Sequence, residues 1–231
     1  MNTIKEGWIT VEFHCHTDFS RDSSNRIPAL IAEARARGID KLAITDHNTI
    51  AGALVAKQLA PDLIIVGEEI LTRQGELLAY FLTEEVPPRL SAEETITRLH
   101  AQGAFIAVPH PFDRHRHGWA LPDLLRILPQ VDAIEVFNAR SFRRVLNDRA
   151  LFFTREHGLP AIAGSDAHGL VELGYARVFL PPFESAQDLR QVVRQSVIHA
   201  KRLSAWAHVK ANLSVVWAKL GGKRKKSQQS A

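Results

Sequence analysis

Cysteine is almost absent from this chain, because Cys15 is the only one among its 231 residues. A single cysteine cannot form an internal disulfide, which excludes the small disulfide-stabilised scaffolds typical of secreted proteins. The N-terminal residues also lack the apolar core of a signal peptide. No uninterrupted apolar run approaches the roughly 20 residues that span a bilayer. We therefore expect a cytoplasmic protein without membrane-spanning segments.

Acidic residues are missing from residues 201–231, which hold eight of the 29 Lys and Arg residues. The first 200 residues therefore carry 21 basic and 25 acidic side chains. The net charge of +4 comes from the C-terminal residues. It does not indicate a nucleic-acid-binding surface over the rest of the chain.

The length and the 45% content of hydrophobic residues support one domain over residues 1–200, followed by a separate segment, 201–231. Apolar residues recur in that segment at three- and four-residue spacing, which predicts an amphipathic helix over Ser204–Leu220. A basic run, Lys223–Lys226, and a polar end predicted to be disordered follow. Three interpretations stay open: packing on the domain or on a neighbouring subunit, adsorption to an anionic membrane, and attraction to RNA. The oligomeric state is equally open.

Short apolar runs alternate with helical patterns along the first 200 residues. Seven strands are predicted: Ile9–His14, Lys41–Thr45, Leu63–Val66, Ala104–Val108, Ala133–Phe137, Pro160–Ala163 and Ala176–Leu180. Six helices are predicted: Pro28–Arg37, Thr49–Leu59, Ser91–Gln102, Leu121–Leu128, Arg144–His157 and Ser185–Arg194. An extra strand, Glu76–Leu82, follows the third. This alternation predicts a parallel α/β sheet, closed as a barrel or open and doubly wound.

Histidines cluster where the predicted strands end. His14 and His16 close the first strand and project to the same side, so both can bind one cation, whereas Cys15 points the other way. His47, Glu69, His110 and the pair Asp166 and His168 follow later strands. In a βα barrel all these ends meet on one face, whereas an open sheet would separate them. The pattern therefore favours a barrel of about seven strands and a metal-dependent hydrolase.

The ordered motifs His-x-His, Thr-Asp-His, Gly-x-Glu, Pro-His-Pro and Gly-Ser-Asp-x-His resemble those of the PHP (polymerase and histidinol phosphatase) superfamily over roughly residues 9–183. The resemblance implies a distorted (β/α)7 TIM-like barrel with a metal site at the C-terminal ends of its strands. It also implies two or three divalent cations such as Mn²⁺, Fe²⁺ or Zn²⁺. Eight residues would be the metal ligands: His14, His16, Asp22, His47, Glu69, His110, Asp166 and His168. Asp18 lies in the same loop as Asp22.

The chain departs from the family pattern at two places. Many relatives carry a histidine or cysteine after the fifth strand, where this chain has Glu135 and Asn138, and some carry a histidine at the position of Glu76. Either Glu135 or Asn138 could complete the metal site with an oxygen. Glu135 could instead orient a ligand histidine from behind.

The branch that the chain most resembles comprises bacterial enzymes that hydrolyse nucleotide phosphoesters, including 3′,5′-bisphosphate nucleotide phosphatases and 5′-to-3′ exoribonucleases. The expected activity is hydrolysis of nucleotides or short oligonucleotides by a metal-activated hydroxide. Asp166, His168 and His110 are the candidate catalytic residues for proton transfer. Basic residues after two strands are predicted to bind the substrate phosphate: Arg114, Arg116, His117, Arg140 and Arg143.

Two other functions stay open. Amidohydrolases that cleave C–N bonds also carry His-x-His after a first strand, but they usually need a bridging carboxylated lysine after a middle strand, and none of the third to fifth predicted strands ends in lysine. The second is a noncatalytic metal- or nucleic-acid-binding accessory module. The nearly complete ligand set opposes it, because ligands left without a metal would repel one another or stay unpaired at a cost in stability. The motifs do not separate monoesters from diesters, and they do not identify the metal.

Overall fold

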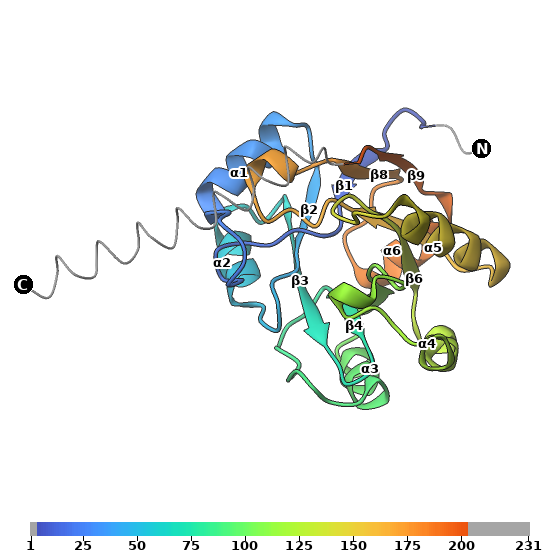
Figure 1. The fold of residues 1–231 in the computed structure, drawn as a ribbon. Coiled ribbons are helices and arrows are strands. Elements are labelled where there is room, and N and C mark those ends of the chain that lie inside the picture. The colour runs from blue at the N-terminus through green and yellow to red at the C-terminus, as the bar shows by residue number, and fades with distance from the viewer. Residues whose placement is uncertain (1–3, 203–231) are drawn as a thin grey trace, which may run out of the picture.

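The computed structural model describes residues 4–202, which form a single curved sheet with helices around its outside (Figure 1). The features predicted for Ser204–Leu220 and Lys223–Lys226 lie outside the described residues. Within 4–202, none of the helices is both long and apolar enough to cross a membrane.

The sheet contains nine strands in the order β7-β6-β5-β4-β3-β2-β1-β8-β9. Their bounds are Ile9–Glu12 (β1), Lys41–Ile44 (β2), Ile64–Leu71 (β3), Glu76–Tyr80 (β4), Phe105–Val108 (β5), Ala133–Asn138 (β6), Ala161–Gly164 (β7), Ala176–Leu180 (β8) and Val197–Ala200 (β9). Strands β1 to β3 are parallel, as are β5 to β7, and β4 is the predicted insertion, antiparallel to both neighbours. The parallel sheet that the alternation predicts is therefore interrupted.

Two strands at the end of the chain differ from the prediction. β8 lies where the seventh strand was predicted, but it pairs antiparallel with β1 instead of extending the parallel order. β9 is not among the predicted strands, and it pairs antiparallel with β8. The result is a distorted, nearly closed α/β barrel.

The barrel closes on one side through the residues that follow β1 and β7. The backbone N–H of His16 donates to the carbonyl oxygen of Ala167 at 3.0 Å, and that of Asp166 donates to the carbonyl oxygen of His14 at 2.8 Å. These two bonds form a short seam, and three of the four residues in it are predicted metal ligands. Closure therefore brings the first and last motifs together.

The six helices are α1 (Ile27–Ala36), α2 (Ala51–Leu59), α3 (Ala92–Ala101), α4 (Leu121–Ile127), α5 (Arg144–Glu156) and α6 (Ala186–Val192). All six were predicted, with ends that shift by a few residues. Ser91 begins α3 with a capping box, since its Oγ accepts from the Glu94 N–H at 3.2 Å while the Glu94 carboxylate accepts from the Ser91 N–H at 2.9 Å.

Apolar residues form three main clusters. One draws on all of β1 to β8, as the interior of a barrel does, and includes Phe13, Tyr80 and Phe105. The Phe13 and Tyr80 rings meet edge to face with centroids 5.6 Å apart. The other two clusters pack helices against the outside of the sheet. Cys15 belongs to one of these outer clusters, which agrees with its predicted direction away from the histidines.

Glu68 in β3 is a buried carboxyl group whose Oε2 accepts only the Val86 N–H, at 3.2 Å, while its Oε1 has no hydrogen-bond partner among the described residues. Burial raises the pKa of Glu68 from 4.5 to about 8. Between these values the folded protein keeps a proton that the unfolded chain loses. The stability therefore falls as pH rises through this window, by up to about 1.4 kcal/mol per pH unit.

We expect Glu68→Gln to remove this loss, because the amide does not ionise. Urea unfolding of both proteins at pH 5.5 and 7.5 measures the effect. The variant should gain roughly 2 kcal/mol relative to the wild type between the two pH values. Equal changes in the two proteins would contradict a neutral Glu68 in the folded state.

Candidate metal centre

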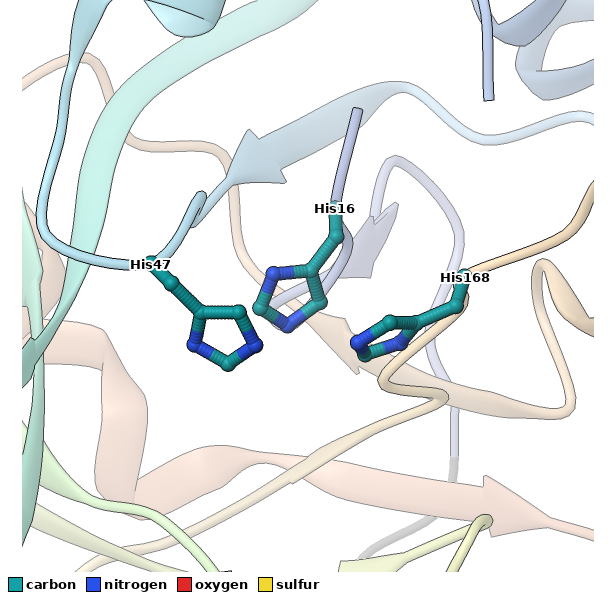
Figure 2. A group of neighbouring side chains, drawn as sticks. All are labelled: His16, His47 and His168. Carbon is teal, nitrogen blue, oxygen red and sulfur yellow. The ribbon is translucent and has the colours of Figure 1, made fainter. Parts of the chain in front are cut away.

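The eight predicted ligands come from loops and strand ends that meet on one face of the barrel. His14 and His16 follow β1, His47 follows β2, Glu69 lies in β3 and His110 follows β5, while Asp166 and His168 follow β7. Figure 2 shows the rings of His16, His47 and His168 turned toward one another. The ring centroid of His16 lies 4.4 Å from that of His47 and 4.2 Å from that of His168.

Glu69 is the centre of this arrangement. Its two carboxylate oxygens lie 3.4 Å from Nε2 of His14 and of His16, and 3.0 Å from the nearest ring nitrogens of His47 and His110. Burial opposes ionisation of Glu69, but His14 and His47 hold its pKa well below the usual range. One carboxylate therefore bridges four imidazoles.

Two more carboxylates from the predicted ligand set lie beside the histidines. Oδ1 of Asp166 lies 3.1 Å from His16 Nε2 and 3.6 Å from His14 Nε2. Asp22, on an exposed loop, has an oxygen 3.2 Å from His168 Nε2 and 3.5 Å from His47 Nε2. The backbone of Asp166 has a φ of 54°, in the left-handed region that non-glycine residues rarely adopt. Such strain is typical of functional sites.

The donor atoms gather as a cation requires. Three groups have their ligand atoms within 4.8 Å of one another: His16, His47 and His168; His14, His16 and Asp166; and His14, Glu69 and His110. Nε2 of His14, Nε2 of His16 and Oδ1 of Asp166 are buried without a hydrogen-bond partner among the described residues. Buried polar atoms are normally paired, and imidazole with carboxylate suits first-row divalent metals. The site therefore fits divalent cations.

The imidazoles do not share one protonation state. Burial lowers the pKa of His14, but Glu69 and Glu135 outweigh it and raise that pKa to about 10. At His47, burial also lowers the pKa, but Glu69 and Asp22 outweigh it and raise the pKa to about 10. Burial, with His168 and His47 nearby, holds the pKa of His16 well below its usual range. Without a cation, the neighbouring carboxylates therefore favour the protonated form of His14 and His47, whereas burial favours the neutral form of His16.

Glu135 lies behind His14 and does not face the cluster. Its Oε1 accepts from Nδ1 of His14 at 3.0 Å, and its Oε2 accepts the His110 N–H at 2.9 Å. Asn138 donates its amide to Glu135 at 3.0 Å and to Asp166 Oδ2 at 3.1 Å. Of the alternatives raised for Glu135, the geometry favours the one that orients a ligand histidine, because Nδ1 is engaged and Nε2 faces the cluster.

Gly164 allows this close approach of β7 to the end of β1. A Cβ atom on Gly164 would lie 2.3 Å from the Cβ of His14 and 2.7 Å from Oε1 of Glu135. Both distances are far inside van der Waals contact. Only glycine fits between His14 and its carboxylate partner without movement.

A cavity of about 440 Å³ opens over the cluster. Its lining includes the basic residues His115, Arg116, His117 and Arg140, as well as Glu76 and Phe142. Arg116 forms an ion pair with Asp166, and its Nη1 donates to Asn138 Oδ1 at 3.0 Å. Arg114 and Arg143, also predicted to bind phosphate, are not among the residues that line the cavity.

Glu76 faces the same cavity as the cluster. Its Oε2 lies 3.8 Å from Nε2 of His110, and burial together with Glu69 raises its pKa to about 8. Phe142, Leu71 and Asn48 also line the cavity, although no motif points to them. Leu71 ends β3, Asn48 directly follows His47, and Phe142 lies in the loop between β6 and α5, so the three meet only in the folded chain.

Comparisons with known proteins agree with this geometry. A PHP domain family model matches residues 12–99, and a PHP-associated model matches residues 145–198. An uncharacterized protein of Methanocaldococcus jannaschii is 35% identical over 153 residues, which cover 61% of this chain and 88% of the relative.

Two solved structures share the fold. A candidate metal-dependent phosphoesterase of Bifidobacterium adolescentis has a TM-score of 0.57 and 19% identity over 69% of this chain and 87% of its own. The lesion-specific endonuclease PfuEndoQ of Pyrococcus furiosus has a TM-score of 0.59 and 15% identity over 83% of this chain and 57% of its own. From its motifs, its fold and its sequence relatives, this chain belongs to the PHP domain family.

Proposed function

We propose that this protein is a metal-dependent hydrolase that cleaves phosphate esters, with nucleotides or short oligonucleotides as its substrate class. The observation that carries the proposal is that one cavity joins the histidine and carboxylate cluster to two arginines. Structures with the same fold include a candidate metal-dependent phosphoesterase and a lesion-specific endonuclease, which supports this proposal.

His14, His16, Asp22, His47, Glu69, His110, Asp166 and His168 would hold two or three divalent cations. Bound there, the cations supply Lewis-acid activation of water and of the phosphoryl group. Glu135 keeps His14 in the orientation that presents Nε2, and Asn138 steadies Asp166. The protein therefore contributes a preorganised set of donor atoms.

Arg116 and Arg140 would bind the substrate phosphate, with His115 and His117 beside them. The guanidinium of Arg116 already pairs with an anion, the carboxylate of Asp166. A phosphate oxygen can replace that carboxylate once Asp166 binds a cation, because a guanidinium recognises both anions with the same fork of donors. Arg140 Nε lies 3.7 Å from Glu172 and is partly buried.

A proton must reach the oxygen of the leaving group. Asp166, His110 and His168 are the candidate proton donors, because all three line the cavity. Nδ1 of His168 donates to the backbone carbonyl of Asp166 at 2.8 Å, which directs Nε2 toward the cavity and Asp22. No lysine is among the residues described along the cavity, so the amidohydrolase alternative lacks its usual bridging group.

The test is a panel of phosphomonoesters, phosphodiesters, 3′,5′-bisphosphate nucleotides and short 5′-phosphorylated RNA, with Mn²⁺ restored after chelation. We expect metal-dependent turnover by the wild type. Arg116→Ala should reduce kcat/KM about a hundredfold, mainly through KM, since a charge-assisted bidentate pair contributes about 3 kcal/mol. Arg114→Ala, two residues away and exposed, is the matched control and should stay near the wild-type value.

Two results would oppose the proposal. No turnover of any phosphate ester by a protein that retains its metal would move the amidohydrolase or binding-module hypothesis to the front. Equal losses in Arg116→Ala and Arg114→Ala would indicate a nonspecific effect of positive charge rather than a phosphate site.

A further inference from the structure

Ser20 lies beneath the metal centre and joins three groups through one hydroxyl. Its Oγ lies 2.6 Å from Oδ1 of Asp46, 3.1 Å from the backbone nitrogen of His47 and 3.3 Å from Nδ1 of His16. Ser20 is 2% exposed, and Asp46 and His16 are fully buried. These groups are buried from bulk solvent, so their hydrogen bonds are made to one another and can be assigned as donor or acceptor.

The carboxylate of Asp46 accepts two hydrogen bonds from Thr17. The Thr17 N–H donates to Oδ1 at 2.7 Å, and the Thr17 hydroxyl donates to Oδ2 at 2.6 Å. A carboxylate surrounded by donors in this way acts only as an acceptor. The short contact from Ser20 is therefore a third donated bond, and it uses the single hydrogen of the Ser20 hydroxyl.

Ser20 Oγ then has only lone pairs left for its other two neighbours. One lone pair accepts the backbone N–H of His47, which can act only as a donor. The other faces Nδ1 of His16, and two acceptors cannot bond to each other, so Nδ1 must carry the hydrogen. Nε2 of His16 is left with a free lone pair, and this atom is buried without a hydrogen-bond partner among the described residues, 3.1 Å from Asp166.

We infer that Ser20, polarised by Asp46, is a positioning residue that holds His16 in the tautomer protonated on Nδ1 and so directs its Nε2 lone pair into the metal centre. His14 is oriented by a carboxylate directly, through Glu135 at 3.0 Å, whereas His16 is oriented by a carboxylate acting through a hydroxyl. The same hydroxyl fixes the backbone of His47. One side chain thus sets two metal-binding loops.

Helix α2 packs closely against the Asp46 carboxylate. Gly52 in the first turn of α2 lies so close that an added Cβ would be 2.4 Å from Oδ2 of Asp46 and 2.6 Å from Oγ of Thr17. Helix α2 can therefore press its N-terminal turn against the carboxylate, where the helix dipole favours a negative charge. Burial raises the pKa of Asp46, and the hydrogen bonds donated by Ser20 and Thr17 oppose this rise.

The inference rests on the metal-binding part of the proposed function and not on the substrate. The first test is the ¹⁵N NMR spectrum of the His16 ring in the Zn²⁺-loaded wild type, assigned by its loss in His16→Gln, because without a cation the oxygens of Asp166 and Glu69, 3.1 Å and 3.4 Å away, compete for a proton on Nε2. A neutral imidazole shows which nitrogen bears the proton. We expect the proton on Nδ1. A proton on Nε2 would overturn the inference without any variant.

The second test compares Ser20→Ala with Ser23→Ala. Ser23 lies in the same loop and is also buried, but its hydroxyl lies between the carbonyl oxygens of His16 and His168, at 3.1 Å and 3.2 Å, and has no hydrogen bond to a ring nitrogen. Zn²⁺ affinity is measured by competition with a chromophoric chelator, and the ring tautomer by NMR. Ser20→Ala should lose the Nδ1 preference and bind Zn²⁺ about ten- to a hundredfold more weakly.

Ser23→Ala should keep the wild-type tautomer. A folded Ser20→Ala protein with unchanged tautomer and affinity would overturn the inference, as would a tautomer change of the same size in Ser23→Ala. If Ser20→Ala fails to fold, the wild-type spectrum still decides. None of these measurements uses a phosphate ester, so they stand whether or not the protein hydrolyses one.

Discussion

Replacement of Glu69 by Gln is expected to abolish metal binding and to lower kcat/KM for phosphate esters by roughly a thousandfold or more, since metal-ion stabilisation of the transition state is worth several kcal/mol. The change preserves the size of the side chain but removes the charge that faces four imidazoles. It also places an amide N–H where a cation would bind. Glu69 contacts four histidines of the cluster, and each group of neighbouring ligand atoms contains at least one of them. The change should therefore weaken metal binding at every group.

Metal content after dialysis against Mn²⁺ and turnover of the preferred phosphate ester measure this effect. Glu68→Gln is the matched control, because the two glutamates are adjacent in β3 while the Glu68 carboxylate turns away toward the Val86 N–H. The control should retain its metal. A Glu69→Gln protein that holds as much metal as the wild type would contradict the bridging position of Glu69.

Gly164→Ala is expected to lose both stability and metal. The added methyl group would meet the Cβ of His14 at 2.3 Å and Oε1 of Glu135 at 2.7 Å. Neither can yield easily, because His14 is held by the backbone seam to Asp166 and Glu135 bonds to three partners. Overpacking of this kind costs about 3 kcal/mol, and here it also separates His14 from the carboxylate that orients it.

Chemical unfolding and Mn²⁺ titration together measure this loss. Gly103→Ala is the control, since a Cβ there meets nothing within 4 Å, although its φ of 71° costs some backbone strain. We expect that control to lose about 1 kcal/mol of stability and to bind metal normally. Metal binding by Gly164→Ala equal to that of the control would show that β1 and β7 can move apart without harm.

Local patterns predicted the helices well and the strand directions less well. The capping box at Ser91 predicts the start of α3 because every atom involved lies within four residues. The antiparallel course of β8 depends on which neighbour it meets across the molecule, and no residue in Ala176–Leu180 encodes that direction. β9 escaped prediction because it is a short, half-exposed edge strand directly after a helix.

The same division holds at the site. The five ordered motifs contain seven of the eight predicted ligands, and these come together because each motif lies at the end of a strand and the strands converge. Asp22 belongs to none of the motifs and was assigned from the loop after the first one through the family resemblance. The partner of a ligand is harder to predict. His14 meets Glu135 across 121 residues of sequence, and Ser20 carries no motif of its own. Arg116 and Arg114 look equivalent in sequence, but a single 3-10 turn brings only Arg116 into the cavity.

The backbone seam that follows β1 and β7 joins the two ends of the barrel at the predicted metal ligands. Its two hydrogen bonds join backbone atoms of His14, His16, Asp166 and Ala167, so three of the residues that close the barrel also present their side chains to the cluster. A cation shared by those side chains would fasten the N-terminal motif to a segment more than 140 residues later in the chain. Metal binding and closure of the barrel would then be linked equilibria. A cation that binds more tightly to the closed barrel would increase the free energy of unfolding by a larger amount.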